Sequence, residues 1–459
     1  MDIGPGSWIL DHPERLDRET QRLYFAQFLR IELVALLFTK RKIVISEPSN
    51  SVDMSLDVHL DEPDDFNSIE LHNSLQTIAL AKGIQDFEYN VDCISGKRAN
   101  YIANVFRVEI SERDSKEHNY SVIIKTLVNT ERQVLYHKLH EREVLAYNKV
   151  ISKFKDIQNV LYEHERLELT ECLHSNTENS REIIILEDLT TKGYDVDGKL
   201  AKYENLGIKE ISTVLAELAK FHALSFVFQF KDPVVFKEIN TEFHDLLYQN
   251  HFLNKTKLRD YFFESFEMSL KLVTDEDARE KLETVKSKLL QLLQMYVKPS
   301  KTNVFCHGDC WAGKVCFIDF QAMRYANPVT DIMYFLFIST DSEFRSEHFD
   351  LLTTIYYDNL KVFLNKFDVK ADDVYKREDF NADIEEFKPY GLLIAMVELR
   401  IVTMAAEDES VFKGSRLDLS IEPTDAPEDN ELHKIRVNDV VKEAVDNGVL
   451  DKLMNIIKI

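Results

Sequence analysis

The chain has 459 residues, of which 44% are hydrophobic and 11% aromatic, so it can form a hydrophobic core and is too long for one compact domain. Its 56 basic and 80 acidic residues give a net charge of −24, which argues against general binding to nucleic acids or anionic membranes. Five cysteines do not suggest a disulfide framework, and neither a secretory signal nor a membrane-length apolar run is visible. We therefore expect a cytoplasmic, monomeric protein without a membrane span.

The first third of the chain is predicted to contain an extension and the start of a sheet-rich domain. Residues 1–66 form the extension, in which a helical pattern within 14–45 precedes an acidic linker that ends in DEPDD. A further helix is predicted at 69–81. The β-branched stretches 106–110 and 121–128 are joined by a polar turn and predict a hairpin.

The remaining elements predict two lobes of different character. A charged helix is expected over 131–154, and strands are expected near 159–163 and 182–186. The pattern after these strands is helical, with helices expected at 258–272, 277–297, 330–338, 346–365, 389–405 and 433–457. We therefore predict an α+β fold with a small β-rich lobe over 67–189 and a larger, mainly helical lobe over 190–459.

Two carboxylates in the stretch VFCHGDCWAGKVCFIDFQAMRYANPVTDIMYFL follow apolar runs. A buried strand at 304–306 leads into a turn that holds Asp309, and a second buried strand at 315–318 ends at Asp319. Phosphoryl transfer uses such a pair, because one carboxylate orients the attacking hydroxyl and accepts its proton while the other holds the metal that bridges the phosphates. The alternative is that each Asp only caps a turn.

The same stretch resembles the catalytic-loop motif of aminoglycoside phosphotransferases and choline kinases, and most of all the ecdysteroid-kinase-like (CHK kinase-like) family. The matching residues are His307, Gly308, Asp309, Trp311, Asp319, Phe320, Gln321, Arg324, Pro328, Asp331, Tyr334, Phe335 and Leu336. The resemblance implies a protein-kinase-like fold and an ATP-dependent O-phosphotransferase that uses ATP and Mg²⁺. Its acceptor would be a hydroxyl of a small lipophilic molecule, such as an ecdysteroid or another steroid or xenobiotic alcohol.

The resemblance also assigns roles within this stretch. Asp309 is implied to be the catalytic base, and His307 beside it is predicted to be a second catalytic residue of the loop. Asp319 is implied to ligate magnesium, and Asp331 is implied to brace the loop from within the fold.

A lysine and a glutamate upstream are predicted to form the phosphate-binding pair. Lys125 lies inside the apolar strand SVIIKTLV, where its charge would be costly without an anionic partner. The resemblance makes it the lysine that contacts the ATP phosphates, held by Glu143 of HEREVLAYNKV. The alternatives are an edge-strand lysine that points to solvent and a solvated glutamate on a charged helix.

The nucleotide contacts implied by the resemblance come from two further segments. Glu187, Asp188 and Leu189 form the connector between the lobes, whose backbone groups would face the adenine ring. The stretch SGKRANYIANVFRV at 95–108 would provide the turn that covers the phosphates, although it is poor in glycine. His222 is interpreted as a core histidine with satisfied hydrogen bonds.

The chain departs from the family pattern directly after the catalytic loop. Relatives carry an Asn that binds a second metal ion and then a strand and turn, whereas here Trp311 is followed by Ala-Gly-Lys and then Val315. Lys314 cannot replace the amide, because an ammonium group only donates hydrogen bonds and repels magnesium. Either the chain is a shortened isoform or a wrongly assembled gene model of an active kinase, or it is a pseudokinase that binds nucleotide or a small ligand with impaired catalysis.

A structural zinc site is an alternative interpretation of the same stretch. Cys306, His307, Cys310 and Cys316 lie close together in sequence, and thiolates with imidazole suit zinc. Two of these cysteines lie in predicted apolar strands, where cysteine acts as a small hydrophobic residue, and no paired C-x-x-C motif is present. The sequence therefore disfavours zinc.

Overall fold

The computed structural model describes residues 68–93, 103–113, 119–127, 131–194, 207–256, 258–310, 316–407 and 431–458. Three predictions fall outside these residues: the N-terminal extension, the Ser-Gly-Lys-Arg-Ala-Asn part of the phosphate-covering turn, and the shortened segment 311–315.

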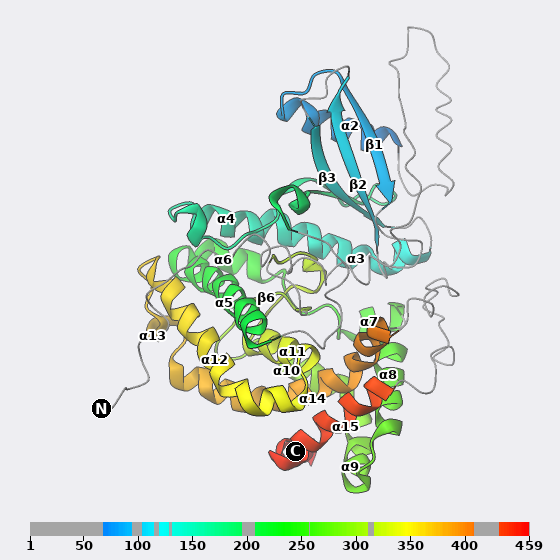
Figure 1. The fold of residues 1–459 in the computed structure, drawn as a ribbon, viewed down its shortest axis with the longest axis vertical. Coiled ribbons are helices and arrows are strands. Elements are labelled where there is room, and N and C mark those ends of the chain that lie inside the picture. The colour runs from blue at the N-terminus through cyan, green and yellow to red at the C-terminus, as the bar shows by residue number, and fades with distance from the viewer. Residues whose placement is uncertain are drawn as a thin grey trace.

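The N-terminal part contains a five-stranded antiparallel sheet with the strand order β1-β2-β3-β5-β4 (Figure 1). The strands are β1 Phe87–Cys93, β2 Ala103–Glu112, β3 Asn119–Leu127, β4 Cys172–Asn176 and β5 Ile183–Glu187. The predicted hairpin is confirmed, because β2 pairs with β3 along its length. Strand β1 was not predicted.

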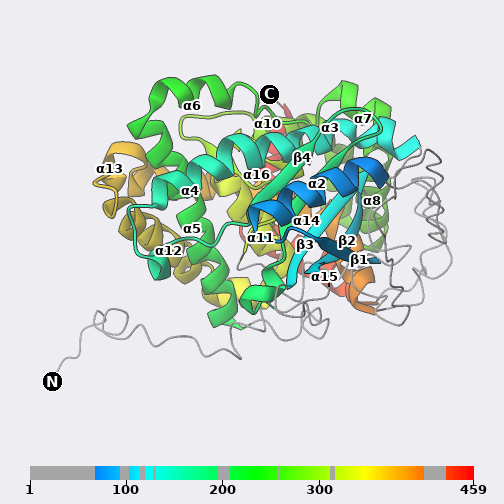
Figure 2. The ribbon, with the colours of Figure 1, turned by 90° about the horizontal axis from the view of Figure 1, so that it is seen from above.

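Helix α2, Ser68–Ala81, covers one face of this sheet (Figure 2). Its apolar residues Leu71, Leu75 and Ile78 recur at the spacing of one helix face, and they share a buried cluster with Ile110 and Ile124 of the sheet. The small lobe therefore has a hydrophobic core of its own.

A long helical segment separates the sheet from the rest of the molecule (Figure 1). It consists of α3 Glu131–Leu145, the π-helical η1 Ala146–Ile151 and α4 Ser152–Gln158. The helix predicted over 131–154 is thus confirmed, with an inserted π segment. Such insertions widen a helix locally and occur often near functional sites.

One predicted strand is wrong. Residues 159–163 form a turn that leads into a short 3₁₀ helix, and the missing edge strand is β4, further along the chain. Two of the apolar side chains that suggested a strand point outward, since Val160 is 77% exposed and Tyr162 is 76% exposed, while Leu161 between them packs into the core. The Gln158 side chain stabilises the turn by bonding both the N–H and the carbonyl of Leu167.

The C-terminal part is mainly helical, as predicted (Figure 1). Its helices are α5 Ile208–Lys231, α6 Pro233–Asn240, α7 Asn250–Thr256, α8 Leu258–Leu272, α9 Glu276–Lys286, α10 Leu289–Val297, α11 Val329–Ser339, α12 Ser342–Asn365, α13 Ala371–Val374, α14 Arg377–Glu407, α15 Glu431–Asp446 and α16 Val449–Lys458. Between α10 and α11 lies a two-stranded antiparallel ribbon of β6 Val304–Cys306 and β7 Arg324–Ala326. The small sheet-rich lobe and the larger helical lobe confirm the predicted α+β architecture.

Helix α5 forms the centre of the large lobe. Among the described helices it alone has the length and hydropathy of a membrane span, but 72% of the qualifying window is buried inside the protein. Burial of that kind fits a core helix, which is apolar on most sides because other elements surround it.

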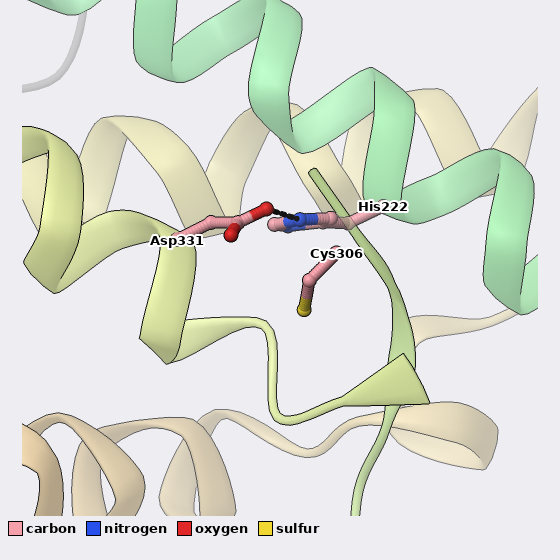
Figure 3. A group of neighbouring side chains, drawn as sticks. All are labelled: His222, Cys306 and Asp331. Atoms are coloured by element: carbon pink, nitrogen blue, oxygen red, sulfur yellow. Dashed lines mark hydrogen bonds and ion pairs between the residues drawn. The ribbon is translucent and has the colours of Figure 1, made fainter. Parts of the chain in front are cut away.

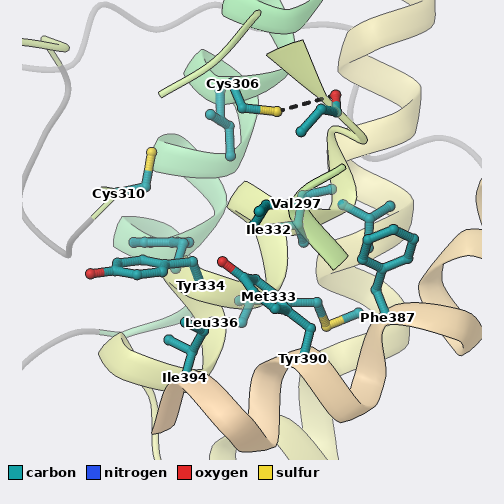
Figure 4. Close-up of a cluster of buried hydrophobic side chains, with 14 of the residues drawn as sticks. Val297, Cys306, Cys310, Ile332, Met333, Tyr334, Leu336, Phe387, Tyr390 and Ile394 are labelled. Carbon is teal, nitrogen blue, oxygen red and sulfur yellow. Dashed lines mark hydrogen bonds between the residues drawn. The ribbon is translucent and has the colours of Figure 1, made fainter. Parts of the chain in front are cut away.

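Helices α11 and α14 approach each other closely at Gly391. A Cβ atom on this glycine would lie 2.6 Å from the Phe337 ring, so a side chain would push the two helices apart. Figure 4 shows the buried residues that α11 and α14 contribute beside this contact, among them Met333, Tyr390 and Ile394. This packing fixes α11, which carries two residues of the candidate site.

Candidate functional site

Lys125 lies in the middle of the sheet and forms an ion pair with Glu143. In register it pairs with Val105 of β2 and Ile184 of β5, so the alternative of an edge-strand lysine is wrong. The Lys125 Nζ lies 2.8 Å from both carboxylate oxygens of Glu143 on α3. Glu143 is 3% exposed, so it is not the solvated helix residue of the other alternative.

Asp319 completes this group from the helical lobe. Its Oδ1 also accepts a hydrogen bond from the Lys125 Nζ. Burial alone would lower the pKa of Lys125, but the charges of Asp319 and Glu143 outweigh it and raise the pKa above its ordinary value. Lys125 is therefore a buried cation held between two carboxylates, one from each side.

The backbone at Asp319 has a conformation unusual for a residue with a side chain. Its φ of 64° and ψ of 59° place it in the left-handed region, where aspartate is tolerated better than most residues. The following residue, Phe320, is fully buried and packs against the rings of Tyr147, Phe221 and His307. This packing holds the turn and aims the Asp319 carboxylate at Lys125.

The strand predicted before Asp319 is only partly present. Within the described residues 316–318, Phe317 forms one isolated bridge with Leu169, and β6 pairs with β7 instead. The turn therefore depends on aromatic packing more than on a regular strand.

The turn after β6 is held by the carboxylate of Asp331, which lies in the first turn of α11. Asp331 Oδ2 accepts a hydrogen bond from the His307 N–H at 2.6 Å, and Oδ1 accepts one from the Gly308 N–H at 2.9 Å. Burial would raise the pKa of Asp331, but its hydrogen bond and charge interaction with His222 help to keep it below its ordinary value. The geometry fits the bracing role that the resemblance implied.

The conformation at Gly308 leaves no room for a side chain. Its φ is +86°, and an added Cβ would lie 2.2 Å from the carbonyl oxygen of Ala322 and 3.0 Å from Nη1 of Arg324. Both the backbone angle and the close approach therefore require glycine here.

His307 is buried, and its ring bonds to the backbone on both sides of the site. Its Nε2 lies 2.8 Å from the Ile318 carbonyl, directly before Asp319, and its Nδ1 accepts the Asp309 N–H at 3.3 Å. These contacts tie the two aspartate-bearing turns to each other. The structure thus places His307 between the turns, where it positions them.

Asp309 is half-buried at the end of the turn and meets a tyrosine from α11. The Tyr334 hydroxyl donates to Asp309 Oδ1 at 2.9 Å. Burial raises the pKa of Tyr334, and the negative charge of Asp309 raises it further, so this phenol stays a hydrogen-bond donor. Tyr334 belongs to the motif that carried the resemblance, but sequence alone did not reveal that it contacts Asp309.

Three potential metal ligands meet beneath this turn, but their polar atoms already have partners. The ligand atoms of His222, Cys306 and Asp331 lie within 4.8 Å of one another (Figure 3). His222 Nε2 lies 3.2 Å from Asp331 Oδ2, and its Nδ1 lies 2.7 Å from the Tyr356 hydroxyl. Burial raises the pKa of the Cys306 thiol well above its ordinary value, which disfavours a metal-binding thiolate. We interpret the cluster as a hydrogen-bond network, and His222 as the core histidine predicted.

The zinc site considered from the sequence is not assembled among the described residues. The Cys316 thiol bonds Thr170 and the Glu168 carbonyl, away from the cluster that contains Cys306. Its burial raises the pKa to about 12. Both cysteines act as buried apolar residues, which agrees with the preference stated above.

The connector between the lobes begins where β5 ends. The Asp188 side chain accepts hydrogen bonds from Arg107 and Ser121 of the sheet and from Thr190 of the following turn. The Asp188 and Leu189 carbonyls accept from Thr191 and Tyr194.

The carboxylate that precedes this turn is also engaged. Glu187 accepts from the Glu171 N–H and pairs with Lys192 at 2.8 Å. These side chains therefore shape the connector, and the contact of Glu187, Asp188 and Leu189 with adenine stays a prediction.

The chain matches the model of the ecdysteroid kinase-like family over residues 97–369, more than half of its length. The chain belongs to the ecdysteroid kinase-like family. The matched range contains every predicted site residue. No curated protein matches the chain significantly.

Among solved structures, the chain is similar to the macrolide 2′-phosphotransferase MphH from Brachybacterium faecium in its apoenzyme form. The sequence identity is 11% and the TM-score is 0.32, and the match covers 74% of this chain and 94% of that one. At that identity and TM-score, the likeness supports no conclusion about this member of the ecdysteroid kinase-like family.

Proposed function

We propose that the protein is an ATP-dependent O-phosphotransferase that phosphorylates a hydroxyl of a small lipophilic alcohol, such as an ecdysteroid or another steroid or xenobiotic alcohol. The observation that carries the proposal is the meeting of Lys125, Glu143 and Asp319 from two lobes. A buried ammonium facing carboxylates from both lobes suits the triphosphate of a nucleotide. Membership of the ecdysteroid kinase-like family supports the same class of reaction.

The residues present fit a magnesium ion at Asp319. Its half-buried carboxylate offers the oxygen ligands that Mg²⁺ prefers, and the Lys125 ammonium beside it would pair with a phosphate oxygen of the nucleotide. When bound, the ion would neutralise charge on the phosphates. Glu143 would stay paired with the Lys125 ammonium and hold it beside the phosphates.

Asp309 would then act as the base. The acceptor's hydroxyl oxygen would attack the terminal phosphorus of ATP while its proton passes to the Asp309 carboxylate, and the bond from that phosphorus to the leaving ADP oxygen would break. The hydrogen bond from Tyr334 fixes the carboxylate from one side. Asp331, through the N–H groups of His307 and Gly308, holds the backbone that carries it.

The test is transfer of labelled phosphate from ATP to a panel of steroid alcohols, with wild type set against Asp309→Ala. We expect product with the wild type and a loss of about 10³-fold or more in the variant, because the base and its orientation are removed together. Equal, near-zero transfer by both proteins would refute the active-enzyme proposal.

A second candidate is a pseudokinase that binds nucleotide without transferring phosphate. The observation that favours it is the sequence Trp311-Ala312-Gly313-Lys314-Val315, which lacks the expected Asn. Binding of ATP and Mg²⁺ by calorimetry, without product from any acceptor, would select this candidate over the first.

A further inference from the structure

A buried tyrosine hydroxyl beside the candidate site has no hydrogen-bond partner among the residues that the structure describes. The tyrosine is Tyr147, which lies in the π-helical segment η1 and is 2% exposed. A buried donor without a partner costs free energy, because water satisfies the same group in the unfolded chain. A partner that becomes available only when a ligand binds would offset this cost.

Two observations place Tyr147 between the elements that carry Glu143 and Asp319. Tyr147 follows Glu143 by four residues on one continuous helical segment, a spacing that puts both side chains on the same side of it. The Tyr147 ring meets the Phe320 ring edge to face, with 5.2 Å between the centroids and 78° between the planes. Phe320 directly follows Asp319, and α3 packs against the short 3₁₀ turn that begins at Phe320. Tyr147 therefore borders both carboxylates that bond Lys125.

The Tyr147 hydroxyl has the chemistry of a permanent donor. Burial, and then the charges of Glu143 and Asp319, raise the pKa of Tyr147 well above its ordinary value. The phenol therefore keeps its proton, and a carboxylate is the natural partner for it.

The Lys125 ammonium uses all of its donors on its two carboxylates. Two N–H groups reach the oxygens of Glu143 at 2.8 Å each, and Asp319 Oδ1 accepts the third. An ammonium group has three donors, so a bond to a phosphate oxygen must replace one of these. Glu143 holds Lys125 by two bonds, whereas Asp319 holds it by one from the other lobe. Asp319 is therefore the carboxylate that needs a new donor when Lys125 pairs with a phosphate.

We propose that the Tyr147 hydroxyl donates a hydrogen bond to the Asp319 carboxylate when nucleotide and Mg²⁺ are bound. This inference rests on the proposed function, in which Lys125 pairs with a phosphate oxygen and Asp319 holds the ion. Tyr147 is a positioning residue in this arrangement, because a carboxylate that is oriented by a neighbouring donor binds a metal ion more tightly. Its ring is already held by Phe320, so little further ordering is needed.

The test removes the hydroxyl and keeps the ring. Tyr147→Phe is compared with wild type and with the control Tyr296→Phe, which removes another buried hydroxyl that lacks a partner among the described residues. Tyr296 lies in α10, where its ring packs beside Phe387 and Tyr390. Calorimetry measures the affinity for a non-hydrolysable ATP analogue, once with Mg²⁺ and once with EDTA. Urea unfolding without nucleotide measures stability, and labelled ATP measures transfer separately.

We expect Tyr147→Phe to bind the analogue at least about tenfold more weakly than wild type in Mg²⁺. In EDTA the two proteins should bind alike, within about twofold, because the hydroxyl acts through the carboxylate that holds the ion. Tyr296→Phe should match wild type under both conditions. Neither variant should unfold at a lower urea concentration than wild type, since each removes a hydroxyl for which the described part of the chain offers no partner.

Three results would overturn the inference while leaving the proposed function intact. Equal affinity of Tyr147→Phe and wild type in Mg²⁺ would mean that the hydroxyl bonds only a buried water molecule. An equal loss of affinity in Mg²⁺ and in EDTA would mean that it does not act through the metal ligand. Unfolding of Tyr147→Phe at a lower urea concentration than Tyr296→Phe would mean that the hydroxyl already has a partner in the protein without ligand.

The proposed function fails in ways that these results do not resemble. A wild-type protein that binds no ATP analogue in Mg²⁺ would refute the proposed function and this inference together. If the expected binding pattern appears but wild type transfers no phosphate to any acceptor, the inference stands and the proposed transferase activity fails.

Discussion

The Nζ of Lys125 in β3 lies 2.8 Å from each carboxylate oxygen of Glu143 in α3, so one ion pair joins the centre of the sheet to the helix that borders the large lobe. Because Asp319 bonds the same ammonium from the other side, the three residues form a bridge between the lobes. Separating a buried pair of this kind leaves an uncompensated charge.

Lys125→Met should weaken both the fold and nucleotide binding. The variant leaves Glu143 and Asp319 facing each other without their cation, so we expect a loss of about 2–4 kcal/mol in stability and at least about tenfold in ATP affinity. Calorimetry with ATP and Mg²⁺ and a thermal melt measure the two effects. Lys138→Met, an exposed lysine of the same helix as Glu143, is the control and should change neither. Unaltered ATP affinity in Lys125→Met would contradict the proposed role.

Gly308→Ala should destabilise the protein far more than the same change at Gly83. Both glycines have a positive φ, +86° and +83°, so the backbone strain of about 1–2 kcal/mol is shared. At Gly83 nothing lies within 4 Å of the added Cβ, whereas at Gly308 it meets the Ala322 carbonyl oxygen at 2.2 Å. We expect an excess loss of at least about 2 kcal/mol at Gly308 in urea unfolding. Similar losses of stability at the two sites would mean that the turn at Gly308 can shift to accommodate the added Cβ atom at little energetic cost.

How much could be read from the sequence depends on whether a contact is encoded locally. Asp309 and Asp319 follow apolar runs in one short stretch. A buried lysine charge is costly without an anion, so Lys125 inside an apolar strand predicts an anionic partner. Asp309, Asp319 and Lys125 could therefore be predicted as parts of one site. Edge strand β4 was missed because all its residues are half-buried and it carries little apolar pattern. The helix predicted at 389–405 begins earlier, at Arg377, so Pro389 lies inside α14, a position that proline usually disrupts.

Contacts between distant segments could not be derived in the same way. Tyr334 follows the catalytic turn within its motif, yet its bond to Asp309 depends on the direction of α11. Glu398 and Tyr261 lie far apart in the chain and meet only because α8 packs on α14. Neither residue has a local pattern that distinguishes it from a surface Glu or a core Tyr.

Asp331→Asn should destabilise the turn that carries Asp309. The amide replaces one acceptor oxygen with a donor that faces the backbone N–H of His307 or Gly308, so one buried donor loses its partner. We expect about 2–4 kcal/mol of lost stability by urea unfolding and a parallel loss of transfer. Asp341→Asn is the matched control: Asp341 caps α12 through the Phe344 N–H, and Asn caps nearly as well, so a change of a few tenths of a kcal/mol at most is expected. Equal losses of stability in Asp331→Asn and Asp341→Asn would show that Asp331 does not brace the turn.

Glu398→Gln should stabilise the protein increasingly as the pH rises. The carboxyl of Glu398 has its pKa raised from 4.5 to about 8 in the fold, mainly by burial and then by the charge of Asp309, while Tyr261 works in the opposite direction. Between these two values the folded protein keeps a proton that the unfolded chain has released. Its free energy of unfolding therefore falls as the pH rises through that interval.

The glutamine variant has no such proton, so its stability relative to wild type should grow between pH 5 and pH 8.5. A gain of about 1–2 kcal/mol is expected, below the full linkage of about 1.4 kcal/mol for each pKa unit, because a half-buried carboxylate can turn toward water. Urea unfolding of both proteins at several pH values measures the difference in their free energies of unfolding. The titration of groups that both proteins share cancels in this difference. Glu378→Gln should show no trend with pH. A difference between Glu398→Gln and wild type that stays constant from pH 5 to pH 8.5 would show that the fold does not raise the pKa of the Glu398 carboxyl.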